Sequence, residues 1–519
     1  MEDPLVSVEK ILGADFEFAN AFFGDCSVTA GRAAEALLAQ IPGYPRRNQG
    51  GTVIEYGRRF LPTCGSSWYI DSDHLEGNLP EHRSAFDHPN ALHGAGFAQA
   101  QAALRAVKAN LPQGVRLNLL ANCSDGNTSW GSHLNVMVTR RCFEDMHERK
   151  PHFAAFFATH LVTSVMYTGQ GLVGAANGRS PCTYQLSQRA DWFETFAGQQ
   201  TMVNRPLINL RDESHAENDL ARVHIIFLDM VLSPVAAILR AGTAQLVLAL
   251  IEAGWSDPTL CLDDPVAAAS AISRDLRMCQ THRTTVRGRR MSALEIQQEI
   301  AQLAGEFIAD GRAEGVVPHA EEIVALWLDT LDLARRRELT VLAGRCDAWL
   351  KYLMLDAQRG KRNLPWSSNA MRMFDSLFAS LDPEVSLFFQ AAQDGCVERM
   401  PDEATVRLFA TEPPDDTRAY FRAHVLRRFG HAVSSMDWSR IRFRVPGARH
   451  WWATAEIPMR DPRRFHRAES EALFQQCSTL EELVDAANTL ALDDSPATEA
   501  EESPSVDSSD NPTYFNNPN

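Results

Sequence analysis

The chain has 519 residues, of which 45% are hydrophobic and 22% are charged, and its formal net charge is −16. A chain of this length exceeds one ordinary hydrophobic core, so we expect a large domain and a smaller appendage. The acidic balance argues against a nucleic-acid partner, because binding to phosphates needs Lys and Arg clustered on one face.

The end of the chain is strongly acidic. Its last 27 residues contain seven acids and no Lys or Arg: Asp493, Asp494, Glu499, Glu501, Glu502, Asp507 and Asp510. Because this segment is also poor in apolar side chains, we expect residues 493–519 to form a disordered acidic tail.

Cysteine usage and hydropathy indicate the compartment. The ten cysteines lack C-x-x-C and zinc-finger spacing, which is typical of free thiols in a reducing cytoplasm. No secretory signal is recognised at the N-terminus. The most apolar stretch, 223–253, is interrupted by His224, Asp229 and Arg240, so we predict a buried strand and a helix there. We therefore expect a cytoplasmic protein that does not bind membranes.

Hydrophobic periodicity predicts mixed helices and strands. Residues 11–18 alternate at period two, so Asp15 and Glu17 should share one face of a strand. Further strands are expected at 68–71, 115–122 and 133–139, and helices at 28–41, 91–111 and 152–168. The glycines at 169, 171 and 174 follow a helix, so we interpret them as a connecting turn instead of a phosphate loop.

The second half of the chain is mostly helical. Ser233 and Pro234 suit the start of a helix that runs to Gly254, and residues 290–357 have a helical pattern almost throughout. After about residue 425 a shorter segment carries its own aromatic residues and a closing helix near 468–491. We therefore predict a catalytic domain over 1–425, a small C-terminal domain over 426–492 and the tail.

Acidic side chains recur in the first predicted strands. Besides Asp15 and Glu17, five residues within 71–81 could contribute to a site: Asp71, Asp73, His74, Glu76 and Glu81. On the strand at 133–139, His133 and Asn135 share one face, whereas Leu134 points to the core. Mg²⁺ needs several oxygen ligands from separate segments, which this pattern offers. The alternative interpretation of the pair at 15 and 17 is a solvated strand face.

Two segments carry arginines that suit phosphate or carboxylate groups. Residues 205–217 include Arg205 and Arg211 around an apolar strand, and guanidinium groups bind both kinds of anion through two parallel hydrogen bonds. Arg418 and Arg422 lie one helical turn apart if a helix starts at Asp416 or Thr417. The alternatives are a solvated charge run for the first segment and a plain surface helix for the second.

Taken in order, these segments resemble the Pup ligase and depupylase family of the bacterial Pup–proteasome system. Four further motifs contribute to the resemblance, which extends from about residue 10 to 430: Gln185-Leu186-Ser187-Gln188-Arg189-Ala190, Ala271-Ile272-Ser273-Arg274-Asp275, Asn363-Leu364-Pro365-Trp366-Ser367 and Leu426-Arg427-Arg428-Phe429-Gly430. The resemblance implies an α+β fold, in which a glutamine-synthetase-like curved antiparallel sheet is packed by helices and followed by a small C-terminal domain.

The resemblance also implies roles for individual residues. Asp71 matches the family's catalytic aspartate. Metal ligands are expected at Asp15, Glu17, Glu76, Glu81 and His133. Nucleotide or phosphate contacts are expected at Asn135, Arg205, Arg211, Arg418 and Arg422. The implied cofactors are Mg²⁺ and ATP, or ADP plus phosphate. The implied partners are Pup or a Pup-like small protein tag, its lysine conjugates and components of the proteasome system.

The direction of the reaction has opposing indications. The spacing from Asp71 to Glu76 resembles the depupylase branch, which hydrolyses the bond between tag and lysine or deamidates the tag's C-terminal glutamine. The short interval between Glu17 and Asp71 is closer to ligase length, and a ligase would join a C-terminal glutamate to lysine. We favour the depupylase branch.

The chain also departs from the family's pattern. Asp15 replaces a glutamate, Leu134 replaces an acid and Phe378 replaces a tyrosine. These departures motivate a third hypothesis, a catalytically silent nucleotide-binding regulator.

Overall fold

The protein is described from a computed structural model that covers residues 7–24, 29–44, 55–216, 219–286, 288–444 and 454–492. The predicted acidic tail, 493–519, lies outside the described residues.

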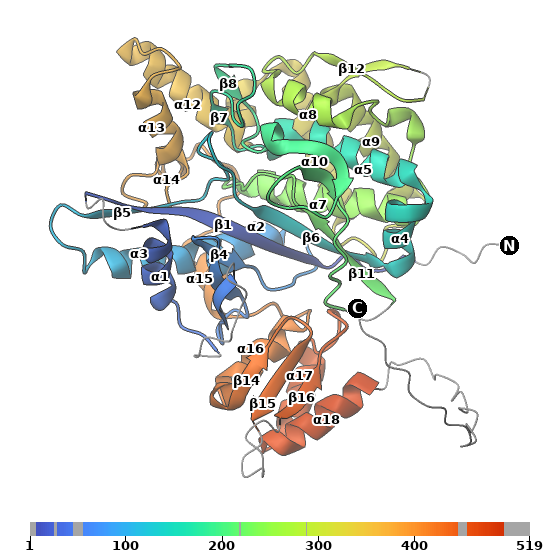
Figure 1. Cartoon of the computed structure of the whole chain (residues 1–519). Coiled ribbons are helices and arrows are strands. Elements are labelled where there is room, and N and C mark those ends of the chain that lie inside the picture. The colour runs from blue at the N-terminus through green and yellow to red at the C-terminus, as the bar shows by residue number, and fades with distance from the viewer. Residues whose placement is uncertain are drawn as a thin grey trace, which may run out of the picture.

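A seven-stranded sheet lies at the centre of the molecule (Figure 1), and its strands pair antiparallel. The order along the sheet is β11-β6-β1-β4-β3-β2, and β5 pairs with the second half of β1. The strands are β1 (Leu12–Phe23), β2 (Glu55–Phe60), β3 (Ser67–Asp71), β4 (His74–Asn78), β5 (Arg116–Leu120), β6 (Ser132–Thr139) and β11 (Leu220–Ile225). β1 pairs with three other strands and therefore organises the sheet.

Side chains of strand β1 alternate between the hydrophobic core and the opposite face of the sheet, as the period-two pattern predicts. Phe16 and Phe18 are buried, and Phe18 stacks on Trp68 of β3 at 6.2 Å. Asp15 and Glu17 alternate with them and are partly exposed. Leu134 of β6 is fully buried in the core, as predicted. The polar side chains of β1 and β6 therefore gather on one face of the sheet.

A tight hairpin between β3 and β4 places Asp71. Ser72 and Asp73 have positive φ angles of 46° and 73°, as the two central residues of a type I′ turn require. Asn20 of β1 fastens this turn, because its side chain accepts from the backbone N–H of Leu75 at 2.8 Å and donates to the carbonyl of Asp73 at 3.0 Å. Asp71 is thereby held at the end of β3.

Helix α7 (Pro234–Glu252) is completely buried and follows strand β11, so the apolar stretch is a strand and a helix as predicted. By length and composition α7 could cross a membrane, but it lies inside the protein. The Ser233 hydroxyl does not cap the helix, contrary to expectation. It donates to Asp347 at 3.0 Å instead, and that carboxylate also accepts from the backbone N–H groups of Leu232 and Ser233.

Other helices pack around the sheet, and in Figure 1 helices α5 and α8 to α10 lie above it together with α7. Gly171 precedes and Gly174 follows the two-residue strand β7 (Leu172–Val173), and both have positive φ angles, which confirms a connecting turn. The helices are α1 (Ala30–Ala39), α2 (Asp87–Ala91), α3 (Gln99–Lys108), α4 (Arg140–Glu144), α5 (Pro151–Thr163), α6 (Val165–Thr168), α8 (Pro265–Arg274), α9 (Ala293–Ala309), α10 (Ala320–Arg336), α11 (Leu339–Ala343), α12 (Asp347–Arg362), α13 (Asn369–Phe378), α14 (Leu387–Gln393) and α15 (Glu403–Thr411).

A small C-terminal unit with its own hydrophobic cluster lies below the sheet in Figure 1. It contains α16 (Ala419–Phe429), β14 (Val433–Met436), β15 (Arg440–Arg444), β16 (Thr454–Pro458), α17 (Arg467–Gln476) and α18 (Leu480–Leu492). The single closing helix that we expected is two helices, α17 and α18, which are separated at 477–479. The division between residues 425 and 426 stays a prediction, and α16 runs across it.

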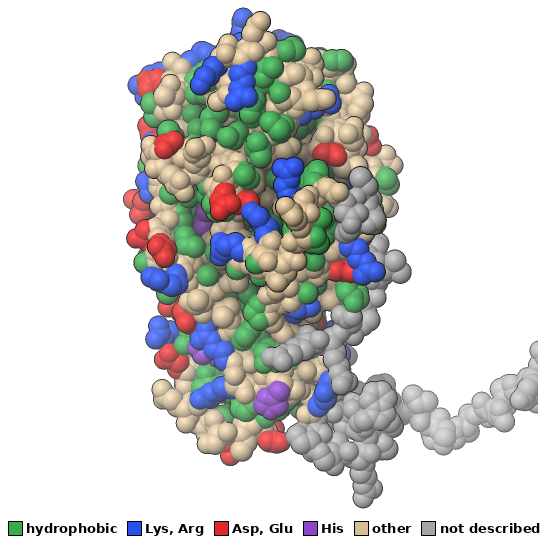
Figure 2. Space-filling view, turned by 90° about the vertical axis from the view of Figure 1, so that its left-hand side faces the viewer, with side chains coloured by type: hydrophobic (Ala, Val, Ile, Leu, Met, Phe, Trp, Pro, Cys, Tyr) green, Lys and Arg blue, Asp and Glu red, His purple; other side chains and the backbone are tan. Residues whose placement is uncertain are grey.

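Charged side chains of both signs are interspersed on the face shown in Figure 2. Among the described residues drawn there, Lys and Arg do not merge into one continuous basic surface.

Replacing Asp347 with Ala tests the hydrogen bonds that anchor the segment just before α7. Three buried donors lose their acceptor, so we expect the free energy of unfolding to fall by about 2 to 4 kcal/mol. Urea unfolding followed by circular dichroism measures this change. The control is Asp356→Ala, since the Asp356 carboxylate is partly exposed and pairs with Arg359 on the surface. Equal losses in both variants would contradict the interpretation.

Candidate functional site

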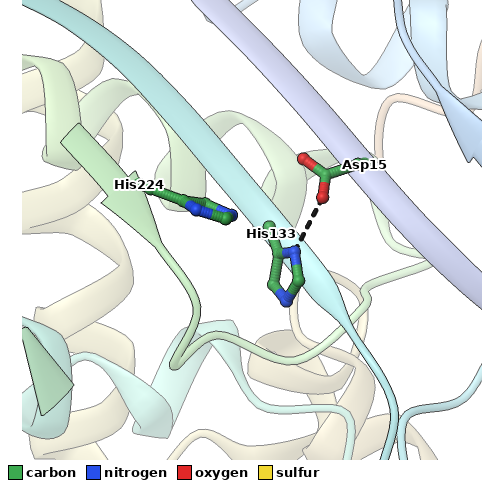
Figure 3. Close-up of side chains that lie close together, drawn as sticks. All are labelled: Asp15, His133 and His224. Carbon is green, nitrogen blue, oxygen red and sulfur yellow. Dashed lines mark hydrogen bonds and ion pairs between the residues drawn. The ribbon is translucent and has the colours of Figure 1, made fainter. Parts of the chain in front are cut away.

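Three neighbouring strands bring Asp15, His133 and His224 together (Figure 3). His133 Nδ1 lies 2.7 Å from one oxygen of Asp15, and the Asn135 amide donates to the other oxygen at 2.8 Å. His224 of β11 is paired in register with Asn135 of β6, so both residues face the same side. One potential ligand atom from each of Asp15, His133 and His224 lies within 4.8 Å of the others, which is close enough to hold one metal ion.

The charge states of this group suit a cation. Burial opposes ionisation of Asp15, but His133 and its hydrogen bond outweigh it and lower the pKa of the carboxyl. Burial, together with Arg222 and His133, lowers the pKa of His224 well below its usual value, so its imidazole is neutral. Both ring nitrogens of His224 are buried without a hydrogen-bond partner among the described residues. A neutral imidazole with an available lone pair is the form that binds metals.

Glu17 and Glu76 form the second part of the site. They lie directly opposite each other in the β1–β4 register, and Glu17 accepts a hydrogen bond from the backbone N–H of Gly131 at 2.7 Å. Burial and the nearby Asp71 raise the pKa of Glu17 to about 7. Burial, Asp15 and Glu17 raise the pKa of Glu76 well above its usual value. A divalent cation would relieve this repulsion between buried carboxylates.

Asp71 lies next to this acidic group at the end of β3. Its charge contributes to the raised pKa of Glu17, and its own carboxylate accepts from the Ser72 hydroxyl at 2.7 Å. Asp71 is partly exposed, whereas Glu76 is buried. Asp71 is therefore placed to meet a substrate at the edge of the acidic group.

Glu81 forms a separate buried cluster with Arg418 and Arg422. Arg418 Nε donates to Glu81 Oε1 at 2.7 Å, and Arg422 Nη2 donates to Oε2 at 2.5 Å. Although burial opposes it, Arg422 and Arg418 lower the pKa of Glu81 to about 2. The predicted metal ligand and the two predicted phosphate-binding arginines therefore bind one another in this structure. This cluster links the segment that follows β4 to the C-terminal unit.

The other predicted phosphate contacts are dispersed. Arg205 donates to the carbonyls of Thr201 and Ser129 at 2.7 Å each. Arg211 is partly exposed, and its nearest acidic partner is Glu213 at 3.9 Å. The described structure thus brings Asn135 directly to Asp15. Arg205 lies at the start of strand β10 (Arg205–Asn209), and Arg211 follows that strand.

Sequence reasoning missed two residues beside the metal-capable group, His224 and Arg222. Arg222 donates to the side-chain carbonyl of Asn135 at 3.1 Å and carries a guanidinium group to this face. Both lie on β11 two residues apart, so a period-two analysis of 220–225 could have placed them on one face. In the sequence alone, His224 is only a polar interruption of an apolar stretch.

The departures at Leu134 and Phe378 lie away from this face. Both side chains are fully buried in the main hydrophobic core, where Phe378 packs edge-to-face on Phe388. Asp15, although shorter than a glutamate, still reaches His133. The three departures therefore leave the acidic group assembled.

Replacing Glu81 with Ala tests the cluster that joins the two units. Two guanidinium groups would stay buried without their carboxylate, so we expect the free energy of unfolding to fall by about 3 to 5 kcal/mol. The control is Glu412→Ala, which removes an exposed pair with Arg427 and should cost less than about 1 kcal/mol.

The same cluster gives a pH dependence with a defined sign. Because the pKa of Glu81 is lowered from 4.5 to about 2, its contribution is complete above pH 4.5 and is lost as the pH falls toward 2. Urea unfolding of the wild type and Glu81→Gln at several pH values measures this effect. A stability difference that does not shrink in that window would count against the ion pairs.

Comparison with known proteins gives concordant results. A family model described as Pup-ligase protein matches residues 31–442. The depupylase of Acidothermus cellulolyticus is 34% identical over 430 residues, which cover 81% of this chain and 82% of that protein. The Pup–protein ligase of Micrococcus luteus is 31% identical over 393 residues, which cover 72% of this chain and 81% of that protein.

Two solved structures share the fold. The ligase PafA in complex with the prokaryotic ubiquitin-like protein Pup has a TM-score of 0.76 at 22% identity, over 93% of this chain and 95% of that chain. PafA in complex with ADP has a TM-score of 0.67 at 23% identity, over 81% and 89% of the two chains. The predicted α+β fold of the glutamine-synthetase type, with a small C-terminal domain, is confirmed.

Proposed function

The chain belongs to the Pup-ligase family, and on that premise we propose that it is an ATP- and Mg²⁺-dependent depupylase and deamidase. It would hydrolyse the isopeptide bond between a Pup-like tag and lysine, or the side-chain amide of a C-terminal glutamine on the tag. The observation that carries this proposal is the position of Asp71, which is partly exposed at the hairpin edge beside Glu17 and Glu76.

The residues present fit a divalent cation. The buried acids and the unpartnered nitrogens of His224 offer the oxygen and nitrogen donors that such ions bind. We propose that the ligands are Asp15, Glu17, Glu76, His133 and His224. Glu81 could join them only if it left Arg418 and Arg422. Bound Mg²⁺ and nucleotide phosphate would supply the positive charge and the anionic scaffold that the reaction needs.

Asp71 would perform the central step. As a base it would take a proton from water while the water oxygen bonds to the amide carbon. The carbon–nitrogen bond then breaks, and the proton passes to the departing amine of lysine or to ammonia. As a nucleophile Asp71 would bond to the amide carbon itself, and the carbon–nitrogen bond would break as the departing amine takes a proton from water. The hydroxide left from that water would then cleave the bond between the acyl group and Asp71, which releases the acid and restores the Asp71 carboxylate. Both routes need an ionised Asp71 in an acidic surrounding, which a cation beside it would favour.

The hydrolytic direction is favoured by sequence. The depupylase matches at higher identity and over more of the chain than the ligase does, and the two-residue turn after Asp71 keeps the depupylase spacing. The alternative is a ligase, which the fold of PafA and the short Glu17–Asp71 interval support. A ligase would consume ATP to activate a C-terminal glutamate before lysine attacks.

Asp71→Asn tests the catalytic role. With a pupylated substrate, nucleotide and Mg²⁺, we expect the release of free tag to fall by about 100-fold or more, because asparagine can neither attack nor accept the proton. Gel electrophoresis of the products measures the release. The control is Asp73→Asn, since that exposed side chain shares the turn. Undiminished release in Asp71→Asn would reject the assignment.

One phosphate assay separates the two directions. The hydrolase needs nucleotide without net consumption, so we expect tag release with no stoichiometric formation of phosphate. A ligase would release one phosphate for each conjugate formed from a tag ending in glutamate. Conjugate formation with matching phosphate release would replace our proposal with the alternative.

His224→Ala tests the metal site. Because one proposed ligand is lost, we expect the Mg²⁺ concentration for half-maximal activity to rise by about 10-fold or more. EDTA should abolish activity in the wild type, and added Mg²⁺ should restore it. The control is His431→Ala, which changes an exposed histidine in the C-terminal unit. An unchanged Mg²⁺ requirement in His224→Ala would remove this residue from the site.

A further inference from the structure

We propose that Arg58 is a positioning residue for the cation site, because it holds Tyr69 and Asn78 against one oxygen of Glu76 and leaves the other oxygen for the ion. This inference rests on the proposed function of Glu76 as a metal ligand. It concerns a residue on β2, the edge strand of the sheet, which belongs to none of the motifs that the sequence analysis considered.

A bulge in β2 directs Arg58 to the face of the site. Tyr56 pairs with Ile70 and Arg59 pairs with Trp68, so two residues of β2, Gly57 and Arg58, lie opposite Tyr69. Gly57 has a positive φ of 74°, which glycine adopts without a steric penalty and which is typical of such a bulge. In a regular ladder Arg58 would lie opposite Trp68 and would face the core. The extra residue reverses this direction.

Arg58 makes two kinds of contact on that face. Its guanidinium carbon lies 3.7 Å from the centre of the Tyr69 ring, a close cation–π contact. Its Nη1 donates to the side-chain carbonyl of Asn78 at 2.9 Å and to the Ser67 hydroxyl at 3.2 Å. One side chain from the edge strand thus orients a residue on β3 and a residue on β4.

Tyr69 and Asn78 both act on Glu76. The Tyr69 hydroxyl donates to Glu76 Oε1 at 2.5 Å, and the Asn78 amide donates to the same oxygen at 3.2 Å. All three side chains are buried. Among the described residues no donor reaches Oε2. Oε1 is therefore occupied by two neutral donors, whereas Oε2 keeps its full capacity for a cation.

The guanidinium also supports the two donors that bind Glu76 Oε1. A cation over the ring withdraws electron density from the phenol, which strengthens its O–H as a donor to Glu76. The Asn78 amide can present its NH₂ to Glu76 because Arg58 binds the amide oxygen and fixes its orientation. Partners in this outer position commonly change metal affinity by about 10- to 100-fold.

Binding of Mn²⁺ alone, measured by electron paramagnetic resonance on the full chain, tests the proposal without catalysis. We expect Arg58→Met to weaken Mn²⁺ binding by about 10-fold and Arg58→Lys to restore little, because an ammonium group cannot cover the ring and bind the amide together. The matched control is Arg32→Met, since Arg32 is exposed and pairs with Glu35. That variant should bind Mn²⁺ like the wild type.

A double-mutant cycle with Tyr69→Phe isolates the connection and guards against misfolding. This substitution keeps the ring under Arg58 and removes only the hydroxyl that reaches Glu76. We expect it to weaken Mn²⁺ binding as well, and the double variant to lose clearly less than the product of the two single losses. Additive losses, or unchanged Mn²⁺ affinity in Arg58→Met, would overturn the role of Arg58.

The outcome for the proposed function is separate. A wild type that binds no Mn²⁺ at millimolar concentration would overturn both ideas. Mn²⁺ binding that depends on Arg58, in a protein that releases no tag, would overturn the proposed activity and support the positioning role.

Discussion

Glu17 and Glu76 lie opposite each other in the register of β1 and β4, and this pairing of a partly exposed and a buried acid is the constraint on which the site depends. The strand ladder fixes the backbone separation of the two residues, so both side chains start from neighbouring points on one face of the sheet. Burial raises the pKa of both carboxyl groups. Asp71 raises the pKa of Glu17 further, and Asp15 and Glu17 raise the pKa of Glu76 further. Such an arrangement is costly without a cation and favourable with one. The fold therefore gathers acidic side chains that a cation would stabilise on this face of the sheet.

Four of the arginines considered above do not bind the carboxylates of this pair, because their guanidinium groups are engaged by other partners. Arg418 and Arg422 are bound by Glu81 between the sheet and the C-terminal unit, and Arg205 is bound by backbone carbonyls. Arg58 approaches the site, but through Tyr69 and Asn78. Under the proposed function, an exchangeable divalent ion would supply the positive charge at the Glu17–Glu76 pair.

Much of this could be predicted from the sequence, because period two and local motifs are properties of short segments. The alternation around Asp15 and Glu17 and the inward direction of Leu134 were correct for this reason. His224, the partners of Glu81 and the bulge at Gly57 were not found. They depend on which strands become neighbours and in which register, and that information lies in contacts between residues far apart in the chain. Even the start of α7 is anchored by a distant residue, because Ser233 donates to Asp347, more than a hundred residues away in the chain.

The acids differ in their place in the sheet. Asp15, Glu17 and Glu76 lie within the width of the sheet, where neighbouring strands fix their oxygens, as a metal ligand requires. Asp71 stands at the strand end, on a turn held by Asn20 of the same strand that carries Asp15 and Glu17. A displacement of β1 would therefore move ligands and catalytic group together. This coupling keeps Asp71 in register with the proposed cation site, so under the proposed function the same arrangement of acids would serve either direction of the reaction.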